Sequence, residues 1–299
     1  MGSSTGRASG RGLVAALATV ALIAASCGSD DDSSGGTTVV GDSSNTTAGV
    51  DSTPASAGGT DVRELVVARD MDVNSLDPAR AYCDTCQIYL TAVYETLITV
   101  DPSDLSQQIP RLATSWEAND DNTVFTFALA DATFADGSPV EAKDVKWSWE
   151  RLSNVKASAS YLMDGYSSIE TPDEKTVVVT FEAPNSAFLP IVSAPYMGVS
   201  NSDEAIAQAS ALADETAETD DSAEPFFLEN SLGSGPYQLE SYTEGDALVL
   251  VRNDNYWNGT PQFPMVTIKQ VKDSASQLQQ LQAGDVDIAM QISLDSLSQ

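Results

Sequence analysis

The chain has 299 residues, of which 14 are Lys or Arg and 44 are Asp or Glu, so its formal net charge is −30. So acidic a chain lacks the basic face that nucleic-acid binding requires, and its charge predicts a well-solvated surface. The sequence contains no histidine, which excludes Ser-His-Asp and Cys-His catalysis within this chain and removes the commonest metal ligand.

The first 26 residues predict an export signal. Arg7 and Arg11 precede the apolar run Leu13–Ala25, which is too short to span a bilayer permanently. A basic start, a short apolar run and small residues before a cut are typical of a secretory signal peptide. Export places the rest of the chain outside the cytoplasm.

Residues 27–60 predict a tether that begins with a lipid anchor. Ala24-Ala25-Ser26-Cys27 is similar to a bacterial lipobox, although Ala24 stands where Leu is usual. This similarity predicts cleavage before Cys27 and acylation of its thiol; the alternative is an ordinary signal followed by a free cysteine. The segment that follows is rich in Ser, Thr, Gly and Asp, and it has too few apolar residues to form a core.

The folded part begins with a strand, a loop and a helix. Arg63–Arg69 predicts the first strand, and Met71–Pro78 predicts a loop whose Asn, Ser and Asp side chains bond nearby backbone. Apolar residues at helical spacing predict an amphipathic helix over Thr85–Ile98, and Asp84 with Gln87 resembles a capping box at its start.

Cys83 and Cys86 flank the start of that helix. In an exported protein with Cys27 acylated, these two remaining cysteines predict a local disulfide. The alternative is redox catalysis, because a cysteine at a helix N-terminus has a lowered pKa. Two thiolates without further ligands make a poor zinc site, so we predict no metal there.

The middle of the chain predicts strands, helices and an acidic segment. Thr123–Leu129 and Thr176–Phe181 alternate as half-buried strands. A turn at Asp136-Gly137 leads to a helix with Val145, Ser148, Trp149 and Leu152 on one face, and Pro184–Val192 predicts the start of another helix. Asp203–Glu224 predicts a solvated helix or loop, because its acids lack the spacing of a calcium loop.

A β-hairpin and a final helix complete the pattern. Gly233, Gly235 and Pro236 predict a tight loop, after which Tyr237–Tyr242 and Ala247–Val251 flank the turn Glu244-Gly245-Asp246. Met265–Val271 predicts a further strand. Asp273 predicts the cap of a helix that ends at Gly284.

Motifs in these segments together resemble the extracytoplasmic solute-binding proteins of peptide/nickel ABC importers, family 5. In chain order, the residues that carry the resemblance are Ser75-Leu76-Asp77-Pro78, Tyr94-Glu95-Thr96-Leu97, Pro110–Trp116, Phe134–Arg151, the loop Gly233–Tyr237, the tail Arg252–Trp257 and the segment Gln282–Ala289. Ser234 replaces the usual Thr of the glycine loop. The run Phe134–Arg151 is the most specific of them.

The resemblance implies an α/β fold: a type II (cluster C) periplasmic-binding-protein-like lobe with mixed β-sheets. Residues 61–284 would form the first lobe, including a peripheral subdomain at about 80–230, and residues 285–299 would begin the crossover to a second lobe that is truncated here. One lobe cannot enclose a ligand, so we expect weak or absent solute affinity.

The function implied is that of a substrate-binding lipoprotein of an ABC importer, not an enzyme, without cofactor or metal. It would capture peptides or similar small solutes between two lobes and deliver them to the permease, as a monomer lipid-anchored on the extracytoplasmic face of the membrane or in the periplasm. The ligand-binding residues implied are Asn74, Ser75, Leu76, Asp77, Gly235 and Tyr237.

Two other functions stay open at this point. The chain can be an exported thiol-disulfide oxidoreductase that uses Cys83 and Cys86, or a non-transport surface sensor on the same fold. An oligosaccharide is a possible ligand, because Trp and Tyr suit sugars as well as peptides. Nickel and haem are less favoured, because the chain has no His and few Met.

Overall fold

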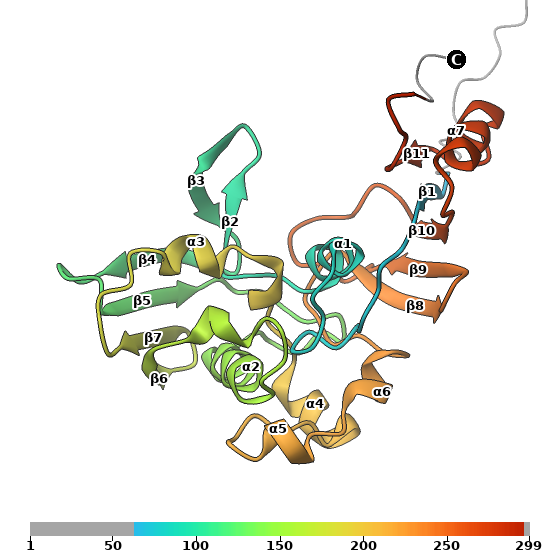
Figure 1. Ribbon diagram of the computed structural model, residues 1–299. Coiled ribbons are helices and arrows are strands. Elements are labelled where there is room, and N and C mark those ends of the chain that lie inside the picture. Colours follow the sequence, from blue (N-terminus) through green and yellow to red (C-terminus); the bar gives the residue numbers. More distant parts are fainter. Residues whose placement is uncertain (1–62, 296–299) are drawn as a thin grey trace, which may run out of the picture. The chain divides into compact units, whose positions relative to one another are not determined.

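Residues 63–295 are described by the computed structural model of this chain, shown in Figure 1. The predicted signal peptide, the acylation of Cys27 and the tether lie outside the described residues. The strands are β1 (Leu65–Arg69), β2 (Ile98–Asp101), β3 (Asp104–Pro110), β4 (Ala113–Ala118), β5 (Val124–Leu129), β6 (Tyr166–Asp173), β7 (Thr176–Phe181), β8 (Tyr237–Thr243), β9 (Ala247–Arg252), β10 (Met265–Gln270) and β11 (Ile288–Ala289).

The helices are α1 (Asp84–Val93), α2 (Ala142–Asn154), α3 (Phe188–Val192), α4 (Ser202–Ala209), α5 (Ala217–Asp220), α6 (Glu224–Phe227) and α7 (Ser274–Ala283). Two 3₁₀ turns, Ser160–Met163 and Pro195–Met197, complete the regular structure of the described part. Within residues 63–295 no helix has the length and apolar character needed to cross a bilayer.

A mixed five-stranded sheet has the order β11-β1-β10-β9-β8 (Figure 1). β1 pairs in parallel with both β10 and β11, whereas β10, β9 and β8 run antiparallel to one another. Gly245 occupies the β8–β9 turn with φ +75°, a conformation that glycine adopts without strain. The predicted hairpin is therefore confirmed, and each of its strands is one residue longer than predicted.

Helices cover both faces of this sheet around β1, which explains the continuous apolar run of that strand. Val67 packs with the buried residues of α1, among them Tyr89 and Leu90. Ala68 packs on the other face with Val271 and Val286, and Leu281 of α7 packs against this cluster. The predicted start of the final helix is confirmed, because the Asp273 side chain accepts from the backbone N–H of Ser276.

A second, antiparallel sheet has the order β4-β5-β7-β6 and carries the largest core. Buried residues alternate along β5 and β7, as predicted, and α2 packs its buried residues, including Trp149 and Leu152, into the same core. The separate hairpin β2–β3 joins this region to α1 (Figure 1). The α/β fold class with mixed sheets is thus confirmed.

The sequence prediction was wrong in several local details. The first helix ends at Val93 rather than Ile98, because Leu97 and Ile98 enter the core of the second sheet and Ile98 starts β2. The cap of α1 is Cys83, not Asp84, so the predicted capping box is absent there. Helix α3 begins only at Phe188, and β11 is a short strand that the sequence analysis did not predict.

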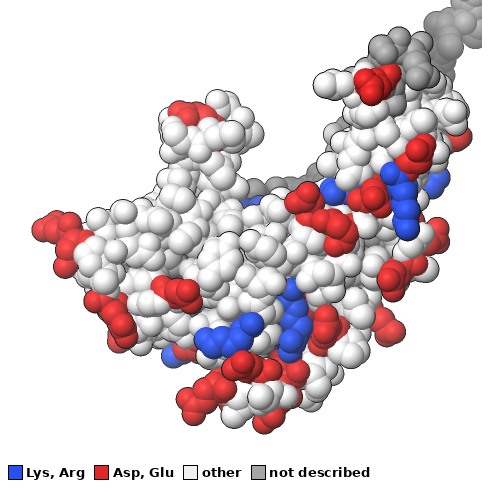
Figure 2. Space-filling model, in the orientation of Figure 1, with Lys and Arg blue, Asp and Glu red and all other residues white. Residues whose placement is uncertain are grey.

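The acidic segment is also more structured than predicted. Residues 203–224 include most of α4, all of α5 and the first residue of α6, and the side chain of Asp221 is fully buried. Figure 2 shows that acidic side chains nevertheless outnumber basic ones on the visible face, in keeping with the composition.

Candidate functional site

The carboxyl ends of three parallel strands meet at one edge of the first sheet. These ends are Arg69 on β1, Gln270 on β10 and Ala289 on β11. In open α/β sheets, ligands bind in the crevice outside the carboxyl ends of the strands. A cavity of about 430 Å³ lies at this edge, lined by Arg69, Asp84, Gln87, Ile88, Met290 and Gln291.

A second cavity, of about 360 Å³, adjoins the same edge. It is lined by residues 70–73, which follow β1, and by Tyr242, Glu244, Gly245, Gln270 and Lys272. The last residue of β1 therefore borders the first cavity, and the loop after β1 borders the second. This edge, with Arg69, residues 70–74, the first turn of α1 and residues 290–291, is named the carboxyl edge below.

Glutamine side chains hold the segments of the carboxyl edge together. Gln291 Oε1 accepts from the backbone N–H of Asp70 at 2.5 Å, and Gln270 Oε1 accepts from that of Met71 at 2.5 Å. Gln277 of α7 is fully buried, donates to the carbonyl of Val271 and accepts from the backbone N–H of Gln291. The chain after β11 is thus held against the loop after β1.

Asp72 caps α1 from the loop after β1. Its carboxylate accepts from the backbone N–H groups of Asp84 and Thr85 at 2.9 and 2.8 Å and from the Thr85 hydroxyl at 2.6 Å. Burial acts to raise the pKa of Asp72, but these hydrogen bonds outweigh it and lower the pKa from 3.8 to about 2. Asp72 therefore stays ionised and fixes the loop to the helix.

Cys83 and Cys86 form a disulfide at the start of α1. The Cys86 side chain is fully buried in the core that α1 shares with the sheet, whereas Cys83 is partly exposed. Cys83 Sγ also accepts from the backbone N–H of Cys86 at 2.9 Å. The disulfide therefore stabilises the N-terminus of α1, the helix that borders the cavity.

Most of the residues predicted to bind the ligand are used within the fold. Leu76 is fully buried against α1, and the Ser75 hydroxyl accepts from the backbone N–H of Asp77. Asn74 has an exposed side chain, yet its Oδ1 accepts from the backbone N–H of Tyr82 at 2.8 Å. Ligand contact by these residues stays a prediction, and Asn74 is the one with an accessible side chain.

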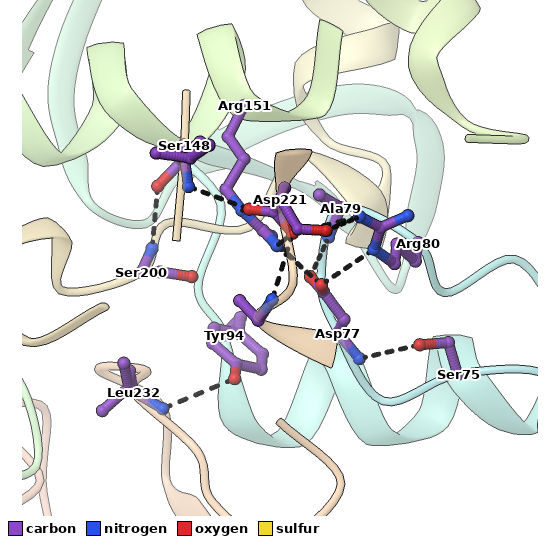
Figure 3. Close-up of polar contacts among 12 residues, drawn as sticks. Ser75, Asp77, Ala79, Arg80, Tyr94, Ser148, Arg151, Ser200, Asp221 and Leu232 are labelled. Atoms are coloured by element: carbon purple, nitrogen blue, oxygen red, sulfur yellow. Dashed lines mark hydrogen bonds and ion pairs between the residues drawn. The ribbon is translucent and has the colours of Figure 1, made fainter. Parts of the chain in front are cut away.

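Asp77 belongs to a buried ion-pair network (Figure 3). Arg151 of α2 donates to both oxygens of Asp77 at 2.5 and 2.6 Å, and it donates to both oxygens of Asp221 at 3.0 and 3.2 Å. Arg80 contributes a further bond to Asp221 at 3.0 Å. The network joins the loop after β1 to α2 and to the segment after α5.

Charge complementarity sets the ionisation of this network. Burial acts to lower the pKa of Arg151, but Asp77 and Asp221 raise it above its usual range. Burial acts to raise the pKa of Asp221, but Arg151 and hydrogen bonds lower it. Arg151 and Asp221 are therefore charged, and all three side chains are paired with one another in the interior, where a ligand does not reach them.

Glu95 is a second saturated buried carboxylate. It accepts from Trp257 Nε1 at 2.7 Å, from the Tyr256 hydroxyl at 2.8 Å, from the Ser234 hydroxyl at 2.9 Å and from Arg111 Nε at 3.2 Å. Burial, followed by the charge of Glu95, raises the pKa of Tyr256. The Ser that replaces the usual Thr keeps the hydroxyl that this contact requires.

The predicted ligand residue Gly235 packs against α1. Its N–H donates to the carbonyl of Val93 at 2.9 Å, and a Cβ there would lie 2.6 Å from the Ala92 and Val93 carbonyl oxygens. At Gly233 a Cβ would lie 1.9 Å from the Val93 oxygen. Tyr237 begins β8 and packs partly against the core of α1. Their contact with a ligand stays a prediction.

The residues that line the larger cavity were not among those predicted from the sequence. Arg69 closes a buried strand, and Gln87 and Gln291 come from segments whose polar residues look solvated in sequence. A usable signal was the arginine at the carboxyl end of the first parallel strand, because that position faces the crevice of an open sheet. Gln291 gave no such signal, since its place depends on β11 and the buried Gln277.

Comparison with known proteins agrees with this architecture. The family model of the bacterial extracellular solute-binding proteins, family 5 (middle), matches residues 107–299. A probable D,D-dipeptide-binding periplasmic protein of Escherichia coli K12, DdpA, is 35% identical over 238 residues, which cover 78% of this chain and 44% of the relative. The dipeptide-binding protein DppE of Bacillus subtilis is 26% identical and matches 82% of this chain and 46% of its own length.

A solved structure shows the same fold. A nickel ABC transporter structure from Bacillus halodurans aligns with a TM-score of 0.63 at 27% identity, over 79% of this chain and 44% of that one. The chain spans less than half the length of each of these three proteins. The family match and the shared fold together place the chain in the bacterial extracellular solute-binding proteins of family 5.

Proposed function

We propose that this chain is the substrate-binding component of an ABC importer, which captures a peptide or similar small solute and passes it to a membrane permease. The observation that carries the proposal is the carboxyl-edge cavity of about 430 Å³ in a chain of this family. Relatives named for dipeptide binding support a peptide-like solute. Binding without chemical change fits a site of one arginine, one carboxylate, two amides and two apolar side chains, and we propose no catalytic role.

The structure suggests how such a site works. Proteins that close two lobes around a ligand use a hinge at a few residues between elements. Here Gln277 and Gln291 anchor the segment that leaves β11, and the disulfide and Asp72 anchor the first turn of α1. We propose that these anchors keep the carboxyl edge rigid, as one wall of the site, while the second lobe closes over the ligand.

The remaining parts of the proposal concern the chain's surroundings. We propose that residues 1–26 direct export, that acylated Cys27 anchors the protein to the membrane and that residues 27–60 tether it. Residues 61–284, together with β11, would act as the first lobe, as a monomer, and the crossover to a second lobe would start within residues 285–299, after β11. Asn74 is the proposed ligand contact of the loop after β1, because its side chain is exposed. Its Nδ2 donates to the Arg80 carbonyl at 3.2 Å, which leaves one amide N–H for the ligand.

Nuclear magnetic resonance of the full chain tests the site directly. D-alanyl-D-alanine, L-alanyl-L-alanine and cellobiose would be titrated into the ¹⁵N-labelled chain, and backbone shifts followed. We expect the dipeptides, but not cellobiose, to shift residues 69–74, 84–88 and 290–291. Because the cavity is open, the expected Kd is about 1 mM or weaker, equivalent to a binding free energy of about −4 kcal/mol.

The proposal fails if the dipeptides leave these three segments unshifted at saturating concentration, or shift only residues elsewhere. Cellobiose shifts at the carboxyl edge would replace the peptide by an oligosaccharide. Micromolar dipeptide affinity would contradict the expectation that this site binds weakly in the 299-residue chain.

A further inference from the structure

We propose that Arg69 forms a subsite for a single carboxylate group of the solute at the carboxyl edge. The inference rests on the proposed function, because it names the chemistry that the same cavity recognises. Arg69 is the last residue of β1 and lines the cavity of about 430 Å³.

Arg69 is largely buried, yet its guanidinium is poorly satisfied. The residue is 5% exposed, and its Nε reaches the carbonyl of Asp70 only at 3.4 Å. Its Nη2 lies 3.8 Å from Asp72 Oδ1, which is too long for a hydrogen bond. Among residues 63–295, neither Nη of Arg69 donates a hydrogen bond. A guanidinium has five N–H donors, so most of its capacity is open.

Arg151 shows what a satisfied buried arginine looks like in the same chain. It is 2% exposed and donates through Nε, Nη1 and Nη2 to Asp77 and Asp221. A buried charge without such partners is unfavourable unless something supplies them. Because Arg69 lines a cavity and Arg151 does not face a comparable one, the missing acceptors of Arg69 fit a ligand.

Asp72 does not fill that role. Its carboxylate already accepts three hydrogen bonds from Asp84 and Thr85 at the start of α1. Its salt-bridge contact with Arg69 is therefore long, and the guanidinium keeps its Nη groups for another acceptor. A planar carboxylate matches this fork of donors with two parallel hydrogen bonds.

The rest of the cavity narrows the class of ligand. Gln87 lines the cavity, and Gln291, whose Nε2 donates one of its two N–H groups to the Asp70 carbonyl at 3.4 Å, keeps the other for a carboxylate. Ile88 and Met290 offer apolar surface to the attached carbon chain. Asp84 also lines the cavity, and the net charge of the chain is −30, so a second negative charge is disfavoured. A monocarboxylate therefore fits better than phosphate or sulfate.

The first experiment needs no knowledge of the solute. Acetate, and acetamide as its neutral isostere, would be titrated into the full chain at constant ionic strength, and the Nε–Hε resonance of Arg69 followed. We expect saturable acetate shifts of Arg69 and none with acetamide, whereas Arg252, which already pairs with Asp254 at 2.8 Å, should not saturate. Equal effects of the two probes, or equal shifts of Arg252, would overturn the subsite.

The second experiment uses D-alanyl-D-alanine and its C-terminal amide with Arg69→Gln, Arg69→Lys and Asp84→Asn. We expect Arg69→Gln to weaken binding of the acid about tenfold and leave the amide unchanged, since a charged hydrogen-bond pair is lost. Arg69→Lys should retain part of the difference, and Asp84→Asn should strengthen binding of the acid about twofold through removed repulsion. Circular dichroism would establish that each variant is folded.

The outcomes separate this inference from the proposed function. Loss of acid and amide binding to the same extent in a folded Arg69→Gln would reject the carboxylate subsite while keeping the binding function. If the unaltered chain binds neither dipeptide form, the dipeptide version of the function is rejected, and the acetate titration alone decides the role of Arg69. If Arg69→Gln does not fold, the acetate titration of the unaltered chain again decides whether Arg69 binds a carboxylate.

Discussion

Two buried arginines of this chain differ in what surrounds them. Arg151 is held by Asp77 and Asp221, while Arg69 has long contacts to one carbonyl and one carboxylate at the edge of a cavity. The first arrangement closes the interior, and the second leaves donors available. A residue's burial alone therefore does not separate a structural charge from a binding charge; its unused hydrogen-bonding capacity does.

The same contrast explains what the family-like motifs do. Residues of these motifs form hydrogen bonds between segments that are distant in sequence, as Asp77, Arg151, Glu95 and the glycine loop do. These motifs specify the packing of the lobe. The cavity is lined instead by residues outside most of the motifs, which allows solute preference to vary on one scaffold.

Arg151→Met should destabilise the chain more than any other substitution proposed below. This change leaves the buried carboxylates of Asp77 and Asp221 without their main partner, and removing one member of a buried ion pair costs about 3–5 kcal/mol. We expect a loss of unfolding free energy of that size in urea, followed by far-UV circular dichroism. Lys146→Met on the same helix is the matched control, because Lys146 pairs with Glu150 at the surface.

The control should change stability by less than about 1 kcal/mol, as exposed ion pairs do. If Arg151→Met is as stable as Lys146→Met, the Asp77–Arg151–Asp221 network does not hold the loop after β1. Asp77 would then be free for the ligand role that the sequence predicted.

A second test concerns the other saturated carboxylate. Glu95→Gln retains the shape of the side chain but removes the charge that accepts from Arg111, Tyr256 and Trp257. We expect a loss of about 2–3 kcal/mol in urea unfolding, because hydrogen bonds to a charged group are involved. The pKa of Tyr256, which burial and Glu95 raise, should fall, as measured with ¹³C-labelled tyrosine.

An unchanged Tyr256 pKa in a folded Glu95→Gln would mean that Glu95 carries no charge in the native chain. Asp254→Asn, three residues before Trp257 and at the surface, is the control and should leave both the stability and the Tyr256 pKa as they are.

Sequence reasoning predicted the elements better than the sites for a physical reason. Period-two and helical patterns locate β5, β7 and α2, because burial of alternate residues is recorded locally. The early end of α1 at Val93 and the burial of Asp221 depend on partners far away in the chain, which no local pattern contains. The motif Ser75–Asp77 was located correctly as a loop, but its side chains face the interior.

The cavity itself was predictable only in part. The rule that ligands bind at the carboxyl ends of parallel strands points to Arg69, provided that β1 is known to be parallel to its neighbours. The partners of β1 are β10 and β11, which lie about 200 residues later in the chain; Leu65, for example, pairs with Val266. This pairing belongs to the tertiary structure, so no local sequence pattern records it. The glutamines that fix the edge follow from the same pairing.

Asp72 links the two kinds of site, because it caps α1 and lies near Arg69, and its replacement should change stability least. Its pKa in the folded chain is about 2, against an ordinary value of 3.8, so the carboxylate contributes stability above about pH 4. This contribution is lost progressively as the pH falls from 3.8 toward 2. Because the Asp72 side chain is about half exposed, the effect should be modest.

Asp72→Asn should therefore flatten the decline in urea midpoint between these two pH values relative to the unaltered chain. Asp101→Asn is the matched control: the pKa of Asp101 is lowered by Ser103 in an exposed turn, far in sequence from the carboxyl edge. Asp72→Asn should also move the Arg69 Nε–Hε resonance and strengthen acetate binding, since Arg69 loses its nearest carboxylate, whereas Asp101→Asn should do neither. If Asp72→Asn weakens acetate binding, then Asp72 orients the guanidinium for its ligand rather than competing with it, and Arg69 is more ordered in the free chain than its long contacts indicate.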